Sequence, residues 1–177
     1  MKARILLIML FILTGCTLFQ SNTSPKRTVE HFFSKYQTLD KEIDTQLDDV
    51  ISKEDLTETQ KKDYKEIMKK QYNDLTYTIK DEIIDGNNAI VTVEIEVYDL
   101  AGSQKDIEEN LNENREDFLK DNEFSNELYM DYRIKKLKEE RKRIKYTLDL
   151  RLTKNDKDKW FIDDLSEAEK KKIHGVY

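Results

Sequence analysis

The chain has 177 residues, of which 38% are charged and 37% apolar, and its formal net charge is −6. Its length allows one ordinary domain or two small ones, and its seven Phe, nine Tyr and one Trp argue against intrinsic disorder. The acidic balance argues against nucleic-acid binding, because neutralising phosphates requires a basic surface. One cysteine excludes an internal disulfide and a cysteine-rich metal site.

The N-terminus has the three parts of a secretory signal. A basic start is followed by an unbroken apolar run, residues 5–13, and by the small residue Gly15 before Cys16. The run is too short to cross about 30 Å of hydrocarbon as a helix. We therefore expect residues 1–15 to be a cleaved signal peptide.

The end of this signal resembles the lipobox of bacterial lipoproteins, which is Leu, a small or polar residue, Gly or Ala, and Cys. The matching residues here are Leu13, Thr14, Gly15 and Cys16. The resemblance implies that the signal peptidase recognises the first three and cuts after Gly15. It also implies that the Cys16 sulfur carries a palmitate-type diacylglyceryl anchor. The chain would then lie at the outer face of a bacterial cell membrane, and the domain resemblance described below indicates a Gram-positive bacterium. There are two alternatives. One is an ordinary secretory signal whose cysteine carries no lipid, and the other is a membrane anchor that is not cleaved.

A short polar segment without periodicity, residues 16–24, follows as the lipidated cysteine and its tether. At about 3.3 Å per residue it would hold the folded part within roughly 25 Å of the lipid. We expect the remainder, residues 25–177, to form a single domain.

Helical periodicity opens this domain. Ser24 before Pro25 is typical of a helix N-terminus. Apolar residues at spacings of three and four continue to Ile51, which predicts one helix or two helices broken near residues 38–40. Residues 57–60 match a capping box and predict a further helix.

The spacing of apolar residues then changes to every second residue. Leu75, Tyr77, Ile79 and Ile83 alternate with polar residues, and a similar alternation covers residues 91–97. The intervening segment Asp-Gly-Asn-Asn is a hairpin turn signal, so we expect an antiparallel pair with one buried face.

The second half repeats this order. Helical spacing returns over residues 101–142, with a break expected at 121–126. Alternation over residues 144–152 and the segment 159–165 predict a second hairpin. The tail from residue 166 is predicted to be a short helix or a frayed end.

These elements predict an α+β fold, in which N-terminal helices pack on a curved antiparallel sheet of about four strands. The segments 25–33, 86–93 and 158–165 resemble nuclear-transport-factor-2-like (cystatin-like) domains, in which helices lie in the concavity of such a sheet. The helical insertion expected at 103–142 departs from that family, where a short turn is usual.

Enzymes of that family resemble polyketide cyclases or ketosteroid isomerases, with acids or histidines directed into the cone. Three acids are in phase with the inward-facing apolar residues of their strands and are the candidate catalytic residues: Asp81, Asp99 and Asp164. A buried carboxylate would have a raised pKa suited to a general base. However, Asp99 and Asp164 are expected at strand ends near water, and Asp81 either faces inward or lies at a bulge. We therefore expect no catalytic residue.

No pattern predicts a cofactor or metal. His31 and His174 are far apart, and the turns at residues 85–88 and 155–158 lack the spacing of a calcium loop. Residues 133–145 are rich in Lys and Arg. They predict contact with anionic lipid or wall polymer, or a solvated helix face paired with acids elsewhere, and we favour the second interpretation.

The leading functional hypothesis is a non-catalytic binding or accessory module at the cell envelope. Its partner would be an envelope protein, a polymer or a small ligand, in addition to the membrane that holds its lipid. One alternative is a cyclase- or isomerase-like enzyme that uses the inward acids. Another is a helical arm for protein–protein interaction, built on residues 103–142.

Overall fold

The computed structural model describes residues 24–177. The predicted signal peptide, the lipobox residues Leu13, Thr14, Gly15 and Cys16, and most of the tether lie outside the described residues. The elements, in chain order, are α1 (Pro25–Gln37), α2 (Lys41–Ser52), α3 (Glu58–Asn73), β1 (Thr76–Asp85), β2 (Asn88–Tyr98), α4 (Leu100–Glu113), the 3₁₀ turn η1 (Arg115–Phe118), β3 (Leu119–Lys120), β4 (Glu123–Phe124), α5 (Asn126–Glu139), β5 (Arg143–Lys154), β6 (Trp160–Ile162) and α6 (Glu167–His174).

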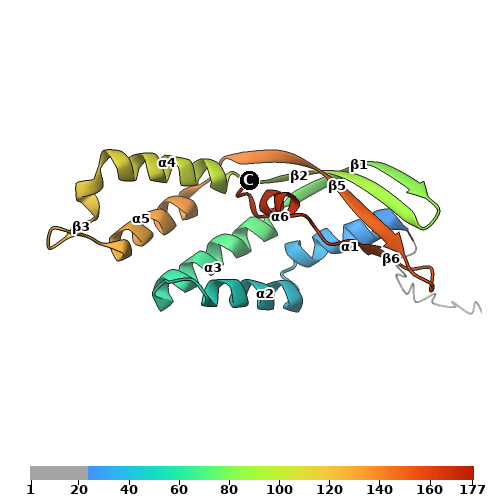
Figure 1. Cartoon of the computed structure of the whole chain (residues 1–177), viewed down its shortest axis with the longest axis horizontal. Coiled ribbons are helices and arrows are strands. Elements are labelled where there is room, and N and C mark those ends of the chain that lie inside the picture. Colours follow the sequence, from blue (N-terminus) through green and yellow to red (C-terminus); the bar gives the residue numbers. More distant parts are fainter. Residues whose placement is uncertain (1–23) are drawn as a thin grey trace, which may run out of the picture.

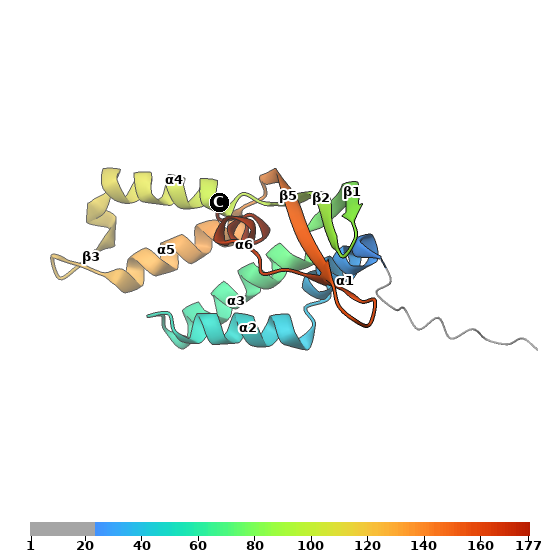
Figure 2. The ribbon, with the colours of Figure 1, turned by 45° about the vertical axis from the view of Figure 1, so that its right-hand side comes forward.

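Four of the strands form an open antiparallel sheet in the order β1-β2-β5-β6. Figures 1 and 2 show α1, α2, α3 and α6 on one side of this sheet. Every second residue is buried along β2, and along β5 from Leu148 onward, and the residues between them are more exposed. The helices that pack on the sheet are α1, α3 and α6, whereas α2 packs on α3. The predicted α+β class, with helices packed on a four-stranded antiparallel sheet, is confirmed.

The edge strand β1 is interrupted by a β-bulge between Ile79 and Asp81. The extra residue, Lys80, reverses the side-chain parity of the rest of the strand. Ile83 therefore pairs with Ile90 on the uncovered face, where both are exposed. The prediction that Ile83 continues the buried face of Ile79 is wrong.

The first predicted helix is in fact two helices. Leu39 has a positive φ of 48° between α1 and α2, and the Asp40 side chain accepts the Ile43 N–H to cap α2. The predicted capping box is present at the start of α3, where Thr57 and Gln60 exchange side-chain and backbone hydrogen bonds.

The core has two parts. The first lies between the sheet and the helices α1 and α6 and consists of Val29, Phe33, Leu75, Ala89, Val91, Val93, Ile95, Val97, Leu148, Leu150, Leu152, Trp160 and Ile173. The second joins α2, α3, α4 and α5 and consists of Ile43, Leu47, Ile51, Ile67, Met68, Tyr72, Leu100, Ile107, Ile134 and Leu137. Side chains of this size are stabilising by about 1.5–3 kcal/mol each when fully buried.

The elements from α4 to α5 form an arm, residues 100–139, that projects from the end of the sheet opposite the start of α1 (Figure 1). Its two helices pack against each other, and α5 packs on α3. The break between them begins earlier than predicted, because α4 ends at Glu113 and the short β3–β4 hairpin fills part of the gap. Within residues 24–177, no helix combines the length and apolarity needed to cross a bilayer.

Candidate functional site

An apolar groove of about 350 Å³ lies between α2, α3, α6 and the C-terminal residues. This volume is at the lower end of the range for ligand pockets, roughly 300–1,000 Å³. We call it the α2–α3–α6 groove. Its lining consists of Tyr36, Ile43, Gln46, Leu47, Val50, Tyr64, Met68, Tyr72, Leu165, Lys170, His174 and Val176.

Helical spacing explains the two walls of the groove. In α2, Ile43, Leu47 and Val50 are separated by four and three residues, so their side chains share one face. In α3, Tyr64 and Met68 are likewise four apart. The two stripes face each other because α2 packs on α3, and the result is a largely apolar surface.

Besides Gln46 and Lys170, whose ammonium group pairs with Glu167 at 2.7 Å, the polar part of the groove is a hydrogen bond of 2.9 Å between the Tyr72 hydroxyl and Nδ1 of His174. Burial, with a smaller effect from the Lys170 charge, lowers the pKa of His174. Burial also raises the pKa of Tyr72 strongly. Both groups are therefore neutral near pH 7, and the groove contains no charged group at this position.

The other two tyrosines of the groove are also neutral hydroxyl groups. Burial and, to a smaller extent, the Glu42 charge raise the pKa of Tyr36 to about 12. Burial raises the pKa of Tyr64. The Tyr36 and Tyr72 rings pack edge to face with centroids 5.2 Å apart. Such a groove suits an apolar molecule with a neutral hydrogen-bonding group.

The position of α6, and so the shape of the groove, depends on Gly175. This residue ends α6 in the left-handed conformation, with φ +73°, and its carbonyl accepts the Ala101 N–H at 2.9 Å. A Cβ here would overlap the side-chain amide of Gln71 and the carbonyl oxygen of Tyr98. The buried Gln71 amide is itself hydrogen-bonded to the Tyr98 backbone, accepting its N–H at 2.9 Å and donating to its carbonyl at 3.3 Å.

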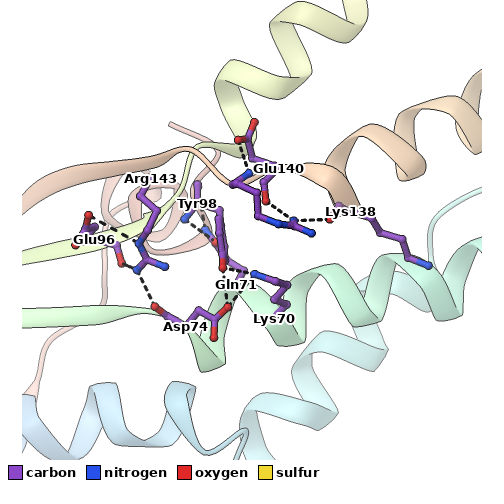
Figure 3. Close-up of polar contacts among 9 residues, drawn as sticks. Lys70, Gln71, Asp74, Glu96, Tyr98, Lys138, Glu140 and Arg143 are labelled. Atoms are coloured by element: carbon purple, nitrogen blue, oxygen red, sulfur yellow. Dashed lines mark hydrogen bonds and ion pairs between the residues drawn. The ribbon is translucent and has the colours of Figure 1, made fainter.

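Next to the contact between Gln71 and Tyr98, a group of polar side chains joins the end of α3 to β2 and β5 (Figure 3). We call it the polar junction. The Tyr98 ring lies 3.6 Å from Nζ of Lys70 and 5.1 Å from Cζ of Arg143, and its hydroxyl donates to Asp74 at 2.7 Å. Arg143 also donates to the backbone carbonyls of Asp74 and Glu96. The hydrogen bond from Lys70 is the main reason that the pKa of Asp74 is lowered. Because these charges neutralise one another, we assign the junction a structural role.

The three candidate acids do not form a site. Asp81 and Asp164 are exposed. Asp81 is in the edge strand β1 and Asp164 follows the opposite edge strand β6, and about 14 Å of sheet, three strand spacings, separates these two strands. The prediction that Asp81 shares the buried face of Ile79 is wrong, because the bulge precedes it. At this position the structure agrees with the alternative, a bulge.

Asp99 is buried but has another role. Its side chain caps α4 by accepting the Gly102 N–H at 2.9 Å, and it pairs with Lys142 at 2.8 Å. Burial raises its pKa, but the bonds from Lys142 and Gly102 outweigh burial, so the pKa of Asp99 is lowered. Its environment is thus the opposite of that needed by a general base near pH 7.

Of the two histidines, His31 is exposed and His174 lines the groove. In the described part of the chain, no three His, Cys, Asp or Glu side chains converge as metal ligands would. The tail with His174 was predicted to be a short helix or a frayed end, and it is the short helix α6. Sequence reasoning missed the groove because it did not indicate where this helix packs. The capping box at Ser166 and Glu169 and the helix-ending Gly175 are the signals that could have located α6.

The basic stretch at residues 133–145 is divided between α5, β5 and the link between them, and four of its eight basic residues pair with acids on other elements. This agrees with the interpretation as a solvated face. The pairs are Lys138–Asp63 at 2.6 Å, Lys142–Asp99 at 2.8 Å, Lys145–Glu94 at 3.2 Å and Arg143–Glu96 at 3.8 Å.

No model of a known protein family matches the chain, and no curated protein matches it significantly. Among solved structures, the chain is similar to a candidate lipoprotein (ycdA) of Bacillus subtilis, with a TM-score of 0.44 and 17% identity. The match covers 75% of this chain and 44% of that one, so the chain spans less than half the length of that protein. This similarity is too low to assign a family or a function.

Proposed function

We propose that the chain is a lipoprotein held at the outer face of a Gram-positive cell membrane through Cys16. Its folded part would act there as a non-catalytic binding or accessory module. The α2–α3–α6 groove is the observation that carries this proposal, because it is ligand-sized, mostly apolar and supplied with neutral polar groups. The ligand would be a small, largely apolar molecule with a neutral hydrogen-bonding group.

The anchor is supported by the lipobox resemblance of residues 13–16. Each buried methylene group contributes about 0.8 kcal/mol, so two acyl chains hold a protein stably where one would be marginal. The helices on one face of the sheet support the further proposal that the fold is related to nuclear-transport-factor-2-like domains.

A binding role is favoured over the cyclase- or isomerase-like alternative. That alternative requires an acid with a raised pKa in a ligand-sized pocket. Asp81 and Asp164 are exposed and far apart, and Asp99 is held ionised by Lys142. None of the three lines the groove.

Replacing Cys16 with serine tests the anchor. Because an oxygen cannot replace the sulfur as the lipid acceptor, we expect Cys16→Ser to lose all labelling by a palmitate analogue in cells and to leave the membrane fraction. Ser21→Ala, a change in the same segment, should keep both. Persistent labelling of Cys16→Ser would refute the lipid site.

Filling the groove tests the binding site. Val50 lines the groove and is 56% exposed, so Val50→Trp obstructs it without disturbing the core. The full chain in detergent would be titrated with 1-aminoanthracene, a neutral apolar amine, and bound dye counted by native mass spectrometry. We expect Val50→Trp to lower the affinity about tenfold or more, equivalent to about 1.4 kcal/mol.

The matched control for this titration is Ile84→Trp, since Ile84 is 53% exposed but belongs to the edge strand β1. Its affinity should equal that of the unmodified chain. Equal affinities in all three proteins would show that the dye binds elsewhere and would remove the groove from the proposal, whereas the result for Cys16 would be unaffected.

A further inference from the structure

The end of the arm, residues 108–127 and the adjoining Leu128, exposes three large apolar side chains. We call it the arm tip. Leu119 and Phe124 are each 39% exposed, and Leu128 is 40% exposed. Leu119 and Phe124 are directly paired across the β3–β4 hairpin, so their side chains lie on the same face. The arm tip therefore presents a small contiguous apolar surface to solvent.

The arm tip is held in place by aromatic packing. Phe118 is buried, and its ring packs edge to face against Tyr129 at 5.7 Å and Tyr132 at 5.3 Å. The Arg115 guanidinium lies 5.1 Å from the centroid of Phe124. The exposed apolar residues thus belong to an ordered hairpin and are presented in a defined geometry, as an interaction surface requires.

The arm tip also contains most of the negative charge of the protein. Residues 108–127 include eight acidic and two basic residues, which gives −6; without Lys2 and Arg4 of the predicted signal peptide the chain carries −8, so only −2 remains elsewhere. All eight acids are exposed, and within residues 24–177 only Glu109 pairs with a basic side chain, Lys105 at 3.8 Å. The other seven acids have no basic partner within residues 24–177, and Asp121 and Glu123 belong to the same hairpin as Leu119 and Phe124.

The acids of α4 are also unfavourably placed for the helix itself. Its last turn contains Glu113 and no basic residue. A negative charge at a helix C-terminus is destabilising, because the carbonyl end of the helix is already partly negative. Helix stability therefore does not account for these acids. Local costs of this kind are expected where a surface serves another role.

We propose that the arm tip docks onto a cationic protein surface that has an apolar depression for Leu119 and Phe124. Opposite charges around an apolar contact favour association and exclude competing partners. Anionic lipids and polymers would be repelled, and so would a second copy, because two arm tips carry the same charge. In Figure 1 the arm tip lies at the opposite end of the molecule from the start of α1. The proposal is independent of the groove and of the lipid.

The test uses the full chain in nanodiscs of zwitterionic lipid and a fluorescent lysine-rich peptide containing two leucines, with binding followed by anisotropy. We expect the triple variant Glu116→Gln, Glu123→Gln and Glu127→Gln to weaken binding about tenfold. The control Glu54→Gln, Asp55→Asn and Glu66→Gln removes the same charge from exposed sites outside the arm tip. It should change the affinity less than about twofold.

The apolar part is tested separately. We expect Phe124→Ser, and Leu128→Ser as a second variant, to weaken binding about fivefold while leaving its salt dependence unchanged. Phe161→Ser, at an exposed phenylalanine of β6, should have no effect. Thermal unfolding of each variant checks the fold.

Three results would overturn the proposal. Equal losses in the two triple variants would show attraction to net charge without a site. Unchanged binding by both Phe124→Ser and Leu128→Ser would show that the apolar residues take no part. Self-association of the chain that is lost on Phe124→Ser would assign the arm tip to a second copy.

Discussion

Gly175→Ala is expected to lower the free energy of unfolding by about 3 kcal/mol or more, because it combines backbone strain with a steric overlap. The left-handed conformation at this position disfavours any residue with a Cβ, and here the Cβ would also overlap Gln71 and the Tyr98 carbonyl. To relieve this overlap, α6 would have to move away from the β2–α4 junction, and this movement would expose Ile173. Urea unfolding gives the free energy, and hydrogen exchange of α6 shows whether the loss is local.

Gly86→Ala provides the matched control. Gly86 also has a positive φ, +59°, but nothing lies within 4 Å of the position of its Cβ. Gly86→Ala should therefore lower the free energy of unfolding by the backbone strain alone, about 1–2 kcal/mol. If the two substitutions cost the same, the close approach of α6 to Gln71 would be refuted.

Phe33→Ala is expected to destabilise the fold by about 3–5 kcal/mol, the usual range for removing a buried phenylalanine. Phe33 is fully buried between α1 and the sheet, and its ring stacks on Tyr77 with centroids 4.9 Å apart. The cavity would open at the contact that joins α1 to the sheet, so no single neighbour can fill it. The loss is measured by urea or thermal unfolding.

Phe161→Ala removes the same side chain from the uncovered face of the sheet, where Phe161 is 53% exposed. It should change stability by no more than about 0.5 kcal/mol. A comparable loss from both substitutions would contradict the burial of one face of the sheet and the exposure of the other.

Local chemistry was sufficient to predict many of the elements. The start of α1 at Pro25 and the capping box at Thr57 depend on residues close in sequence, and both are present. The turn between β1 and β2 depends on Gly86, whose positive φ is accessible to glycine at little cost. The fold class followed from the order of these elements.

Other features depend on contacts between distant residues. The bulge after Ile79 inserts one residue into an otherwise regular alternation, and nothing in the alternation locates it. The role of Asp99 as a helix cap paired with Lys142 depends on where α4 and β5 meet. The groove forms because α6 returns to pack on α3, and the spacing within either helix does not contain that information.

The edges of the sheet bear on the proposed membrane anchor, which would bring neighbouring copies together in one plane and in similar orientations. A regular unpaired strand edge would then be a template for linear polymers. Here one edge strand, β1, has its backbone ladder interrupted beside the lysine at position 80, and the other, β6, offers only three residues. An interrupted edge and a three-residue edge both disfavour extension of the sheet from one copy to the next, so we expect anchored copies to stay separate.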